Sequence, residues 1–261
     1  LQLYNRRCEP GQFGSLRLVL TGAEKLTDEL ADAFAERFGL RPIQGYGATE
    51  CAPAIAVCAP GYRAAGFYQS GSRRGSVGRP VPGVTVKIVD PDTYEPLALG
   101  KAGMVLVRGA NVMQGYLGRD DLTEKAMHDG FYITGDIGRM DADGFLFLTD
   151  RLSRFSKIGG EMVPHGAIED HLQECAGIHD RAFAVCGVPD PRKGERLAVL
   201  TTLPESELPD ILEKMSLRGL PALFLPRLNQ FVHSAELPLL GTGKLDLRKV
   251  KEILIAAAGD D

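Results

Sequence analysis

The chain has 261 residues, which is enough for two domains or one large one. Its hydrophobic content of 44% and charged content of 25% are ordinary for a globular protein. The formal net charge of −4 gives no basis for a nucleic-acid partner, and no apolar run reaches the length of a membrane span. The chain begins without an initiator Met or a signal peptide, which predicts an internal or processed piece of a longer protein.

The chain contains five cysteines, Cys8, Cys51, Cys58, Cys175 and Cys186. An odd count without a Cys-x-x-Cys pair predicts a reducing, cytoplasmic setting. His171 and Cys175 would share one helix face, but no second ligand pair stands at a recognisable spacing, so no zinc site is expected.

The first elements predict the end of an α/β sheet. Residues 15–20 alternate as a strand would, and a helix follows in which Thr27 is the expected N-cap and Gly39 the stop. A further strand leads into a turn at residues 45–50. This strand-helix-strand order is typical of a sheet with helices on its faces.

The middle of the chain is rich in strands. Short alternating runs at residues 85–89, 104–108 and 145–148 are separated by glycines. Closely spaced strands with such turns predict a small β-barrel or a folded-over sheet.

Beyond residue 153 the pattern mixes helices and strands. Helices are expected at residues 167–176, 208–217 and 247–258, and strands at 182–188, 197–202 and 229–233. The predicted fold class is therefore α/β and α+β: the end of an α/β subdomain, a small β-barrel-like subdomain, then a mobile α+β C-terminal domain. The expected domains are residues 1–152, divided into an α/β piece (1–70) and a β-rich piece (71–152), and residues 153–261.

The stretch from Gln44 to Glu50 combines a glycine turn, an aromatic ring, a hydroxyl and a carboxylate. Glycine lets backbone amides approach a phosphate closely. Tyr46 could stack on a purine, Thr49 could donate to a phosphate oxygen, and Glu50 could hold Mg²⁺. The same pattern also suits an ordinary turn after a strand.

Three later segments carry similar candidates. Asp136, after a Thr-Gly turn, could accept hydrogen bonds from two ribose hydroxyls or simply cap a turn. Residues 150–161 are rich in charge and glycine, as a solvated linker would also be. Lys244 lies on a Gly-x-Gly loop, where a cation suits charge that develops on phosphate or carboxylate oxygens, although a surface lysine before a helix has the same pattern.

Taken in order, these four segments resemble the adenylate-forming superfamily of acyl-CoA synthetases, luciferases and peptide-synthetase adenylation domains. Residues 75–83 and 107–116 are similar to its connecting motifs, so the resemblance covers essentially the whole chain. The runs GYGATECAP, RFSKIGGEMV, GVPDPRKGE and PLLGTGKLDLR are most similar to the synthetase part of the acyl-[acyl-carrier-protein] synthetase / 2-acylglycerophosphoethanolamine acyltransferase family. These signatures shade into ordinary acyl-CoA ligases.

The resemblance implies a role for each candidate residue. It implies an ATP or AMP site with Mg²⁺ held by Glu50, the α-phosphate touched by Thr49, and the ribose held by Asp136 with help from Arg151. It implies that Lys244 bridges the α-phosphate and the acyl carboxylate. The remaining implied positions are the adenine side (Gly22, Ala23, Glu24), the turn around the stacking Tyr46 (Gly45, Gly47) and the pantetheine path (Gly159, Gly160).

The implied reaction has two steps. A fatty acid and ATP form acyl-AMP, and the last domain then rotates about residues 151–153 to admit the thiol of CoA or of acyl carrier protein. Two departures stand out: Ser153 replaces the usual hinge Asp or Lys, and the triphosphate loop is absent. We therefore expect a missing N-terminal part, in an enzyme of the cytoplasm or of the cytoplasmic face of the inner membrane. A CoA ligase for another carboxylic acid and a non-catalytic nucleotide- or carrier-binding fragment are the alternatives.

Overall fold

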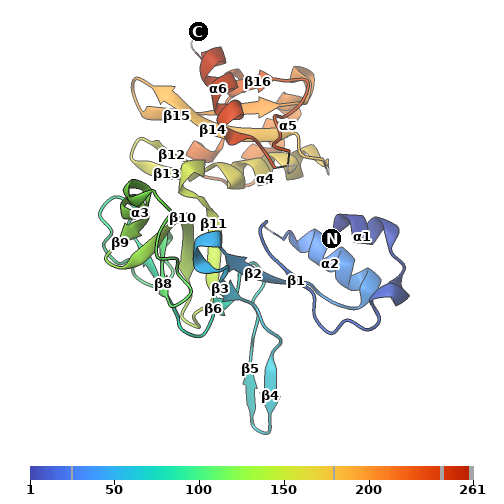
Figure 1. Cartoon of the computed structure of the whole chain (residues 1–261). Helices are drawn as coiled ribbons and strands as arrows, with labels where there is room; N and C mark the ends of the chain where they lie inside the picture. The colour runs from blue at the N-terminus through green and yellow to red at the C-terminus, as the bar shows by residue number, and fades with distance from the viewer. Residues whose placement is uncertain (25, 179, 242–243, 259–261) are drawn as a thin grey trace. The chain divides into compact units, whose positions relative to one another are not determined.

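The computed structural model describes residues 1–24, 26–178, 180–241 and 244–258. The chain divides into two compact units, Leu1–Leu148 and Thr149–Asp261 (Figure 1). The division falls within one strand, β11 (Leu146–Arg151). None of the described helices has the length and apolar character needed to cross a membrane.

Unit 1 begins with a small helical cluster around one aromatic ring. The helices are α1 (Gln2–Arg7) and α2 (Asp28–Phe38), with the short 3-10 helix η1 (Pro10–Phe13) between them. The Phe13 ring lies 4.6 Å from that of Phe38 and 5.7 Å from that of Phe34. The Thr27 hydroxyl accepts a hydrogen bond from the amide of Leu30, and Gly39 ends α2 at φ 72°. The predicted helix is therefore confirmed at both ends.

A four-stranded sheet follows, in the order β1 (Leu20–Thr21), β2 (Ile43–Gly47), β3 (Ala54–Val57) and β6 (Arg79–Pro80). β1 and β2 run parallel, and β2, β3 and β6 pair antiparallel. The predicted strand over residues 15–20 is wrong for all but its last residue. Only Leu20 and Thr21 find a partner strand, and the side chains of Leu16 and Leu18 stay exposed, so alternation alone did not make a strand.

A second sheet of unit 1 has the order β11–β10–β8–β7. Its strands are β7 (Val84–Val89), β8 (Gly103–Gly109) and β10 (Phe131–Met140), with β11 at one edge. The helix α3 (Asp120–Ala126) leads into β9 (Met127–His128), which pairs with β10. The sheet is an open half-barrel that fulfils the barrel-like prediction. A shared core packs it against the first sheet, from residues Cys51, Ile55, Ala56, Val77, Val105, Val107, Tyr132 and Leu146.

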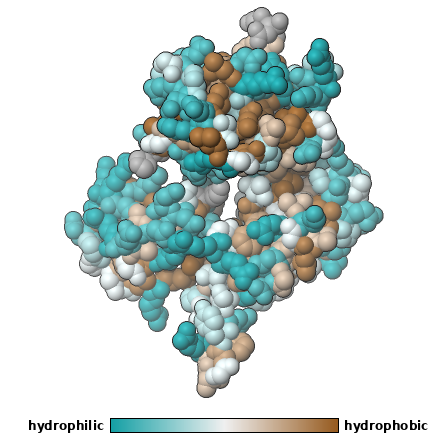
Figure 2. Space-filling view, turned by 180° about the vertical axis from the view of Figure 1, so that it is seen from behind, coloured by the Kyte–Doolittle hydropathy of each residue, from teal (hydrophilic) through white to brown (hydrophobic). Residues whose placement is uncertain are grey.

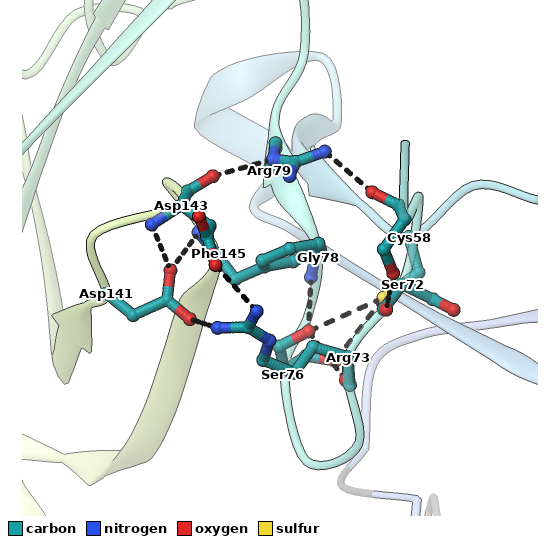
Figure 3. A network of polar contacts seen from close by, with 10 residues as sticks. Cys58, Ser72, Arg73, Ser76, Gly78, Arg79, Asp141, Asp143 and Phe145 are labelled. Atoms are coloured by element: carbon teal, nitrogen blue, oxygen red, sulfur yellow. Dashed lines mark hydrogen bonds and ion pairs between the residues drawn. The ribbon is translucent and has the colours of Figure 1, made fainter. Parts of the chain in front are cut away.

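A polar network fastens the segment before β6 to the turn between β10 and β11 (Figure 3). The guanidinium groups of Arg73 and Arg79 lie 5.0 Å and 4.1 Å from the centroid of the buried Phe145 ring. Arg73 also pairs with Asp141 and Asp143. Just beyond, Gly78 has φ 94°, and a Cβ there would lie 1.9 Å from the backbone of Val57, so only glycine fits.

Between β3 and this network the chain forms a separate hairpin of β4 (Tyr62–Ala64) and β5 (Phe67–Gln69). In Figure 1 the hairpin extends away from the rest of unit 1.

Unit 2 is a sheet with helices on both faces. Its main strand order is β13 (Glu161–Pro164), β12 (Phe155–Ile158), β15 (Gly194–Thr201) and β14 (Phe183–Asp190), and β16 (Phe231–His233) pairs with β15. The helices of unit 2 are α4 (His165–Ala176), α5 (Leu208–Ser216) and α6 (Leu247–Ala258). Its 3-10 helices are η3 (Leu152–Arg154), η4 (Glu205–Glu207), η5 (Ala222–Phe224) and η6 (Leu228–Gln230), whereas η2 (Thr49–Cys51) lies in unit 1.

Alternation along β14 explains why both faces of this sheet are buried. Phe183 and Val185 pack into a core with α4 and α5, whereas Ala184 and Cys186 pack into a second core with α6. Successive side chains of a strand point to opposite faces, so a strand covered on both sides reads as an unbroken hydrophobic run. The helices expected near residues 167, 208 and 247 are confirmed.

Candidate nucleotide site

Two of the predicted loops meet at one edge of the first sheet. β1 and β2 are parallel and pair as Leu20 with Ile43 and Thr21 with Gln44. The loops that follow the two strands therefore leave the sheet at the same edge. A Cβ on Gly22 would lie 3.2 Å from the carbonyl oxygen of Gly45, so the loops are in close contact. Ala23 adopts a positive φ of 72°, and Gly22, Ala23 and Glu24 are exposed. The carboxyl ends of parallel strands are where open α/β sheets bind ligands.

The turn after β2 is tight and leaves its polar groups accessible. A Cβ on Gly47 would lie 2.1 Å from the carbonyl oxygen of Pro53, and that oxygen accepts a hydrogen bond of 2.9 Å from the amide of Ala48. The chain then enters η2, where Thr49 is exposed and Glu50 is half-buried. An exposed hydroxyl beside backbone that only glycine can occupy is suited to contact with a phosphate.

Asp136 reaches this edge from the second sheet. The pairing of β10 with β8 shifts register between Ile133 and Ile137, and Gly135 within that bulge has φ 72°. A β-bulge redirects side chains. The Tyr46 hydroxyl donates to Oδ2 of Asp136 over 2.5 Å. The candidate for base stacking and the candidate for binding the ribose hydroxyls are therefore in direct contact. The Thr134 hydroxyl holds the bulge, because it donates to the Val105 carbonyl oxygen and accepts from the Asp136 amide.

Glu50 is held by the segment that follows β8. The Tyr116 hydroxyl donates to Oε1 of Glu50 over 2.8 Å, and the amide of Met113 donates to the Glu50 carbonyl oxygen over 2.7 Å. The hydrogen bond to Glu50 raises the pKa of Tyr116, and burial next to the Glu50 charge raises the pKa of Tyr132. Both phenols therefore stay protonated beside the Glu50 side chain.

Glu50 is the candidate residue of this site that could hold a divalent cation. The described residues contain no cluster of three or more His, Cys, Asp or Glu side chains that could form a closed metal cage. Mg²⁺ is commonly bound by one or two carboxylates together with substrate phosphates and water. One carboxylate beside an exposed turn fits that pattern.

The remaining candidates belong to unit 2. Gly159 and Gly160 are the two central residues of the β12–β13 hairpin, and their φ values of 60° and 92° are those that a two-residue turn of type I′ requires. Lys244 is exposed, and its carbonyl oxygen accepts a hydrogen bond of 2.7 Å from the amide of Leu240. Its neighbours 242 and 243 lie outside the described residues. Arg151 and Ser153 are exposed at the start of the unit.

Polar contacts, some of them fully buried, involve residues on both sides of the predicted hinge in the sequence. Arg154 pairs with Glu169 of α4 over 2.5 Å, and its Nε lies 3.5 Å from Oδ2 of Asp150. The same Asp150 oxygen accepts the amide of Gly166 over 3.0 Å. Ser156 and His165, both almost fully buried, share a hydrogen bond of 2.8 Å. Burial, with the charges of Arg154 and Lys251, lowers the pKa of His165 to about 3.

Sequence reasoning missed the supporting residues of the site. Tyr116 and Asn111 were noted only within a motif, yet Tyr116 holds Glu50. The Asn111 amide donates to the carbonyl oxygens of Cys51 and Ala54, which closes the turn that carries Glu50. A tyrosine or an asparagine near the glycine-rich end of a strand indicates a hydrogen-bonding role. The sequence pattern does not indicate which residue accepts the hydrogen bond.

A cavity of about 280 Å³ lies elsewhere in unit 1, between α2, β2 and the segment 72–76. Its arginines are neutralised, since Arg41 and Arg74 both pair with Asp32 and Arg73 pairs with Asp141. Of the candidate stretch 44–50 only Gln44 lines it, and no other described candidate residue does.

The candidate residues of unit 1 gather at the carboxyl ends of the parallel strands β1 and β2, which is where open α/β sheets bind ligands. Residues 2–117 match the model of the family described as AMP-binding enzyme. A long-chain-fatty-acid–CoA ligase of Salmonella typhimurium is 32% identical over 251 residues, which cover 96% of this chain and 42% of the ligase. A feruloyl-CoA synthase of an Amycolatopsis species is 36% identical over 189 residues, covering 72% of this chain and 36% of the synthase.

Among solved structures, an O-succinylbenzoate coenzyme A synthetase of Bacillus subtilis, in complex with AMP, superposes with a TM-score of 0.71 and 25% identity. The match covers 90% of this chain and 46% of that one. The chain thus spans less than half the length of these relatives. Residues 2–117 thus match the AMP-binding enzyme family, and the similarity to a CoA ligase extends over 96% of the chain.

Proposed function

We propose that this chain is part of an AMP-forming acyl ligase that activates a fatty acid as acyl-AMP and transfers it to a phosphopantetheine thiol. The observation that carries the proposal is the meeting of Tyr46, Asp136, Thr49 and Glu50 on one sheet edge. Those groups offer a base platform, a ribose acceptor, a phosphate donor and a metal ligand within one site. The printed activities of the relatives, fatty-acid and aromatic CoA ligation, support the reaction class.

In the first proposed step a carboxylate oxygen of the acid attacks the α-phosphorus of ATP, and the bond to the pyrophosphate oxygen breaks. Tyr46 stacks on the adenine and Asp136 accepts the ribose hydroxyls, which fixes the α-phosphate next to Thr49. Mg²⁺ held by Glu50 would supply charge neutralisation on the phosphates. Lys244 meets the negative charge that develops between the two reactants.

In the second proposed step the thiol gives up its proton to solvent and its sulfur attacks the acyl carbon, and AMP leaves with the bonding electrons. Unit 2 rotates about Arg151–Ser153, which withdraws Lys244 and brings the Gly159–Gly160 turn to the thiol path. A side chain at this turn would narrow that path, and its positive φ values favour glycine in any case. Arg151 then supports the ribose together with Asp136. Excluding water during the exchange protects the acyl-AMP from hydrolysis.

The proposal can be made more specific about two substrates, the carboxylic acid and the thiol acceptor. Similarity over almost the whole chain to a long-chain ligase favours a fatty acid, and four sequence motifs favour acyl carrier protein as acceptor, in an enzyme of lysophospholipid reacylation. A second candidate is a CoA ligase for another carboxylic acid, which the 36% identity to a feruloyl-CoA synthase favours. Competition between CoA and loaded acyl carrier protein, with palmitate and ferulate as acids, separates the two. A reducing, cytoplasmic compartment is proposed because all five cysteines are free thiols.

Pyrophosphate exchange tests the proposal. The complete enzyme should exchange labelled pyrophosphate into ATP when a fatty acid and Mg²⁺ are present, whereas these 261 residues alone should not. Exchange by the chain alone would show that no further segment is needed. No exchange by the complete enzyme with any acid, despite AMP binding, would favour a non-catalytic nucleotide-binding role.

A further inference from the structure

The β4–β5 hairpin carries large aromatic side chains on a projection that nothing in unit 1 covers. Tyr62, Phe67 and Tyr68 are 62%, 55% and 60% exposed. Every residue of both strands is exposed, and in Figure 1 the hairpin stands clear of the two sheets. A two-stranded hairpin is at best marginally stable in water, and contiguous exposed apolar surface marks an interaction site.

The aromatic side chains lie on both faces of the hairpin. Tyr62 pairs with Gln69 and Ala64 with Phe67, which puts the Tyr62 and Phe67 rings on one face, 6.3 Å apart. Arg63 pairs with Tyr68 on the other face, and its guanidinium lies 5.3 Å from the centre of that ring. In Figure 2 the hairpin appears as a narrow lobe on which pale and brown surface gathers toward the tip.

The segment that contains the hairpin carries basic side chains and no acidic ones. The sequence has no Asp or Glu between Glu50 and Asp90, although the chain as a whole has a net charge of −4. Arg73 and Arg74, at the base, pair with aspartates from other segments. The ion pairs of the described residues do not include Arg63, which leaves its charge available on the hairpin itself.

The base of the hairpin is fixed. The amide of Ala59 donates to the carbonyl oxygen of Gly71 over 2.8 Å, and Arg79 donates to the carbonyl oxygen of Ser70 over 2.9 Å. That arginine belongs to the network around Phe145 (Figure 3). The chain therefore presents an exposed aromatic hairpin on a rigid support, which lowers the entropic cost of docking it.

We propose that the β4–β5 hairpin inserts its tip into the headgroup region of a lipid surface that contains anionic phospholipids. Aromatic rings favour the interface between headgroups and acyl chains, and an arginine among them can reach a lipid phosphate while its stem stays apolar. A second copy of the chain would bury one face of the hairpin and leave the other wet. A lipid interface surrounds both faces, and its negative charge complements Arg63.

The absence of tryptophan from the chain makes a direct test available. Phe67→Trp places one reporter on the hairpin, and Leu99→Trp places a matched reporter on another exposed turn of unit 1, where Leu99 is 70% exposed. Vesicles of equal parts phosphatidylcholine and phosphatidylglycerol should shift the Phe67→Trp emission to the blue. Brominated acyl chains should quench it, and neither effect should appear for Leu99→Trp or with phosphatidylcholine alone.

The charge and the rings can then be separated in the Phe67→Trp background. Arg63→Gln should weaken partitioning into the anionic vesicles about fivefold, the usual contribution of one basic residue near such a surface. Tyr62→Ser with Tyr68→Ser should abolish the shift. A blue shift without vesicles that grows with protein concentration would identify a second copy as the partner and overturn the proposal, as would equal emission of both reporters with vesicles. The assay involves no catalysis, so its outcome is independent of the proposed ligase activity.

Discussion

The candidate residues of unit 1 and those of unit 2 are held in opposite ways. In unit 1, Tyr46 and Glu50 are each tied by a side-chain hydrogen bond to a residue of another segment, Asp136 and Tyr116. In unit 2, Lys244 is exposed on a loop, and the Gly159–Gly160 turn closes a hairpin. The buried or partly buried polar contacts of unit 2 involve other residues, Arg154 with Glu169 and Ser156 with His165.

The difference fits a division of labour. A nucleotide must be held in one geometry, so its site benefits from groups fixed in advance. A cation that serves only one of two steps must be able to approach and leave, so it belongs on an exposed loop of a self-supporting unit. Four changes test this contrast, in order of falling effect.

The largest effect is expected for Lys244→Ala in the complete enzyme. The loss of a cation that meets developing charge should slow acyl-AMP formation by about 10²–10³. Thioester formation from supplied acyl-AMP should continue, because the rotated unit takes the lysine away from the phosphate. The half-reactions are measured separately by pyrophosphate exchange and by thiol acylation.

Lys249→Ala, an equally exposed change on α6, serves as the control for the lysine variant and should leave both half-reactions intact. Equal loss in both half-reactions for Lys244→Ala would contradict the assigned role.

Gly47→Ala tests the fixed geometry of the unit 1 loop. The new Cβ would lie 2.1 Å from the Pro53 carbonyl oxygen, so the backbone must move, at a cost of about 3 kcal/mol. Gly45→Ala is the matched control, because its Cβ would meet no atom nearer than the Leu20 side chain at 3.4 Å, an ordinary contact distance. Urea unfolding, monitored by circular dichroism, compares the stabilities of the two variants. Equal stability would show that a side chain at position 47 causes no backbone strain.

Acid should destabilise unit 2 through His165. Its pKa of about 3 in the folded state lies below its ordinary value near 6.5 in the unfolded chain. Between these values the unfolded state binds more protons, so stability falls with decreasing pH by up to about 1.4 kcal/mol per pH unit. Hydrogen exchange of β14 amides from about pH 7 down to about pH 5 measures the slope, because this range crosses the upper end of the window between the two pKa values.

His165→Gln keeps a polar partner for Ser156 but has no titrating ring. Its stability should depend less on pH over the same range. An unchanged slope in this variant would assign the acid sensitivity to other groups.

The smallest effect is expected for Tyr46→Phe. The ring remains, and only the hydrogen bond to Asp136 is lost, at about 1 kcal/mol of stability. AMP affinity, measured by calorimetry, should fall less than in Tyr46→Ala, which removes the stacking platform as well. If both variants bind AMP as the unaltered chain does, Tyr46 is no part of the nucleotide site.

Much of the secondary structure could be predicted because its determinants are local. Thr27 and Gly39 mark the ends of α2, and Gly177 ends α4 at φ 67°. Capping depends on groups within about four residues, so the sequence alone displays it. The segment at residues 15–19 shows the limit, since a strand exists only where another strand supplies hydrogen bonds.

The sequence by itself determined the candidate loops, their order and the residue types suited to a nucleotide. Only the tertiary structure decided which of them meet. Tyr46 and Asp136 are 90 positions apart, and Glu50 and Tyr116 are 66 apart. Their contacts depend on the parallel register of β1 with β2, on the bulge at Gly135 and on the packing of one sheet against the other. No periodicity within one segment encodes these relations, because they arise only when separate segments pack together.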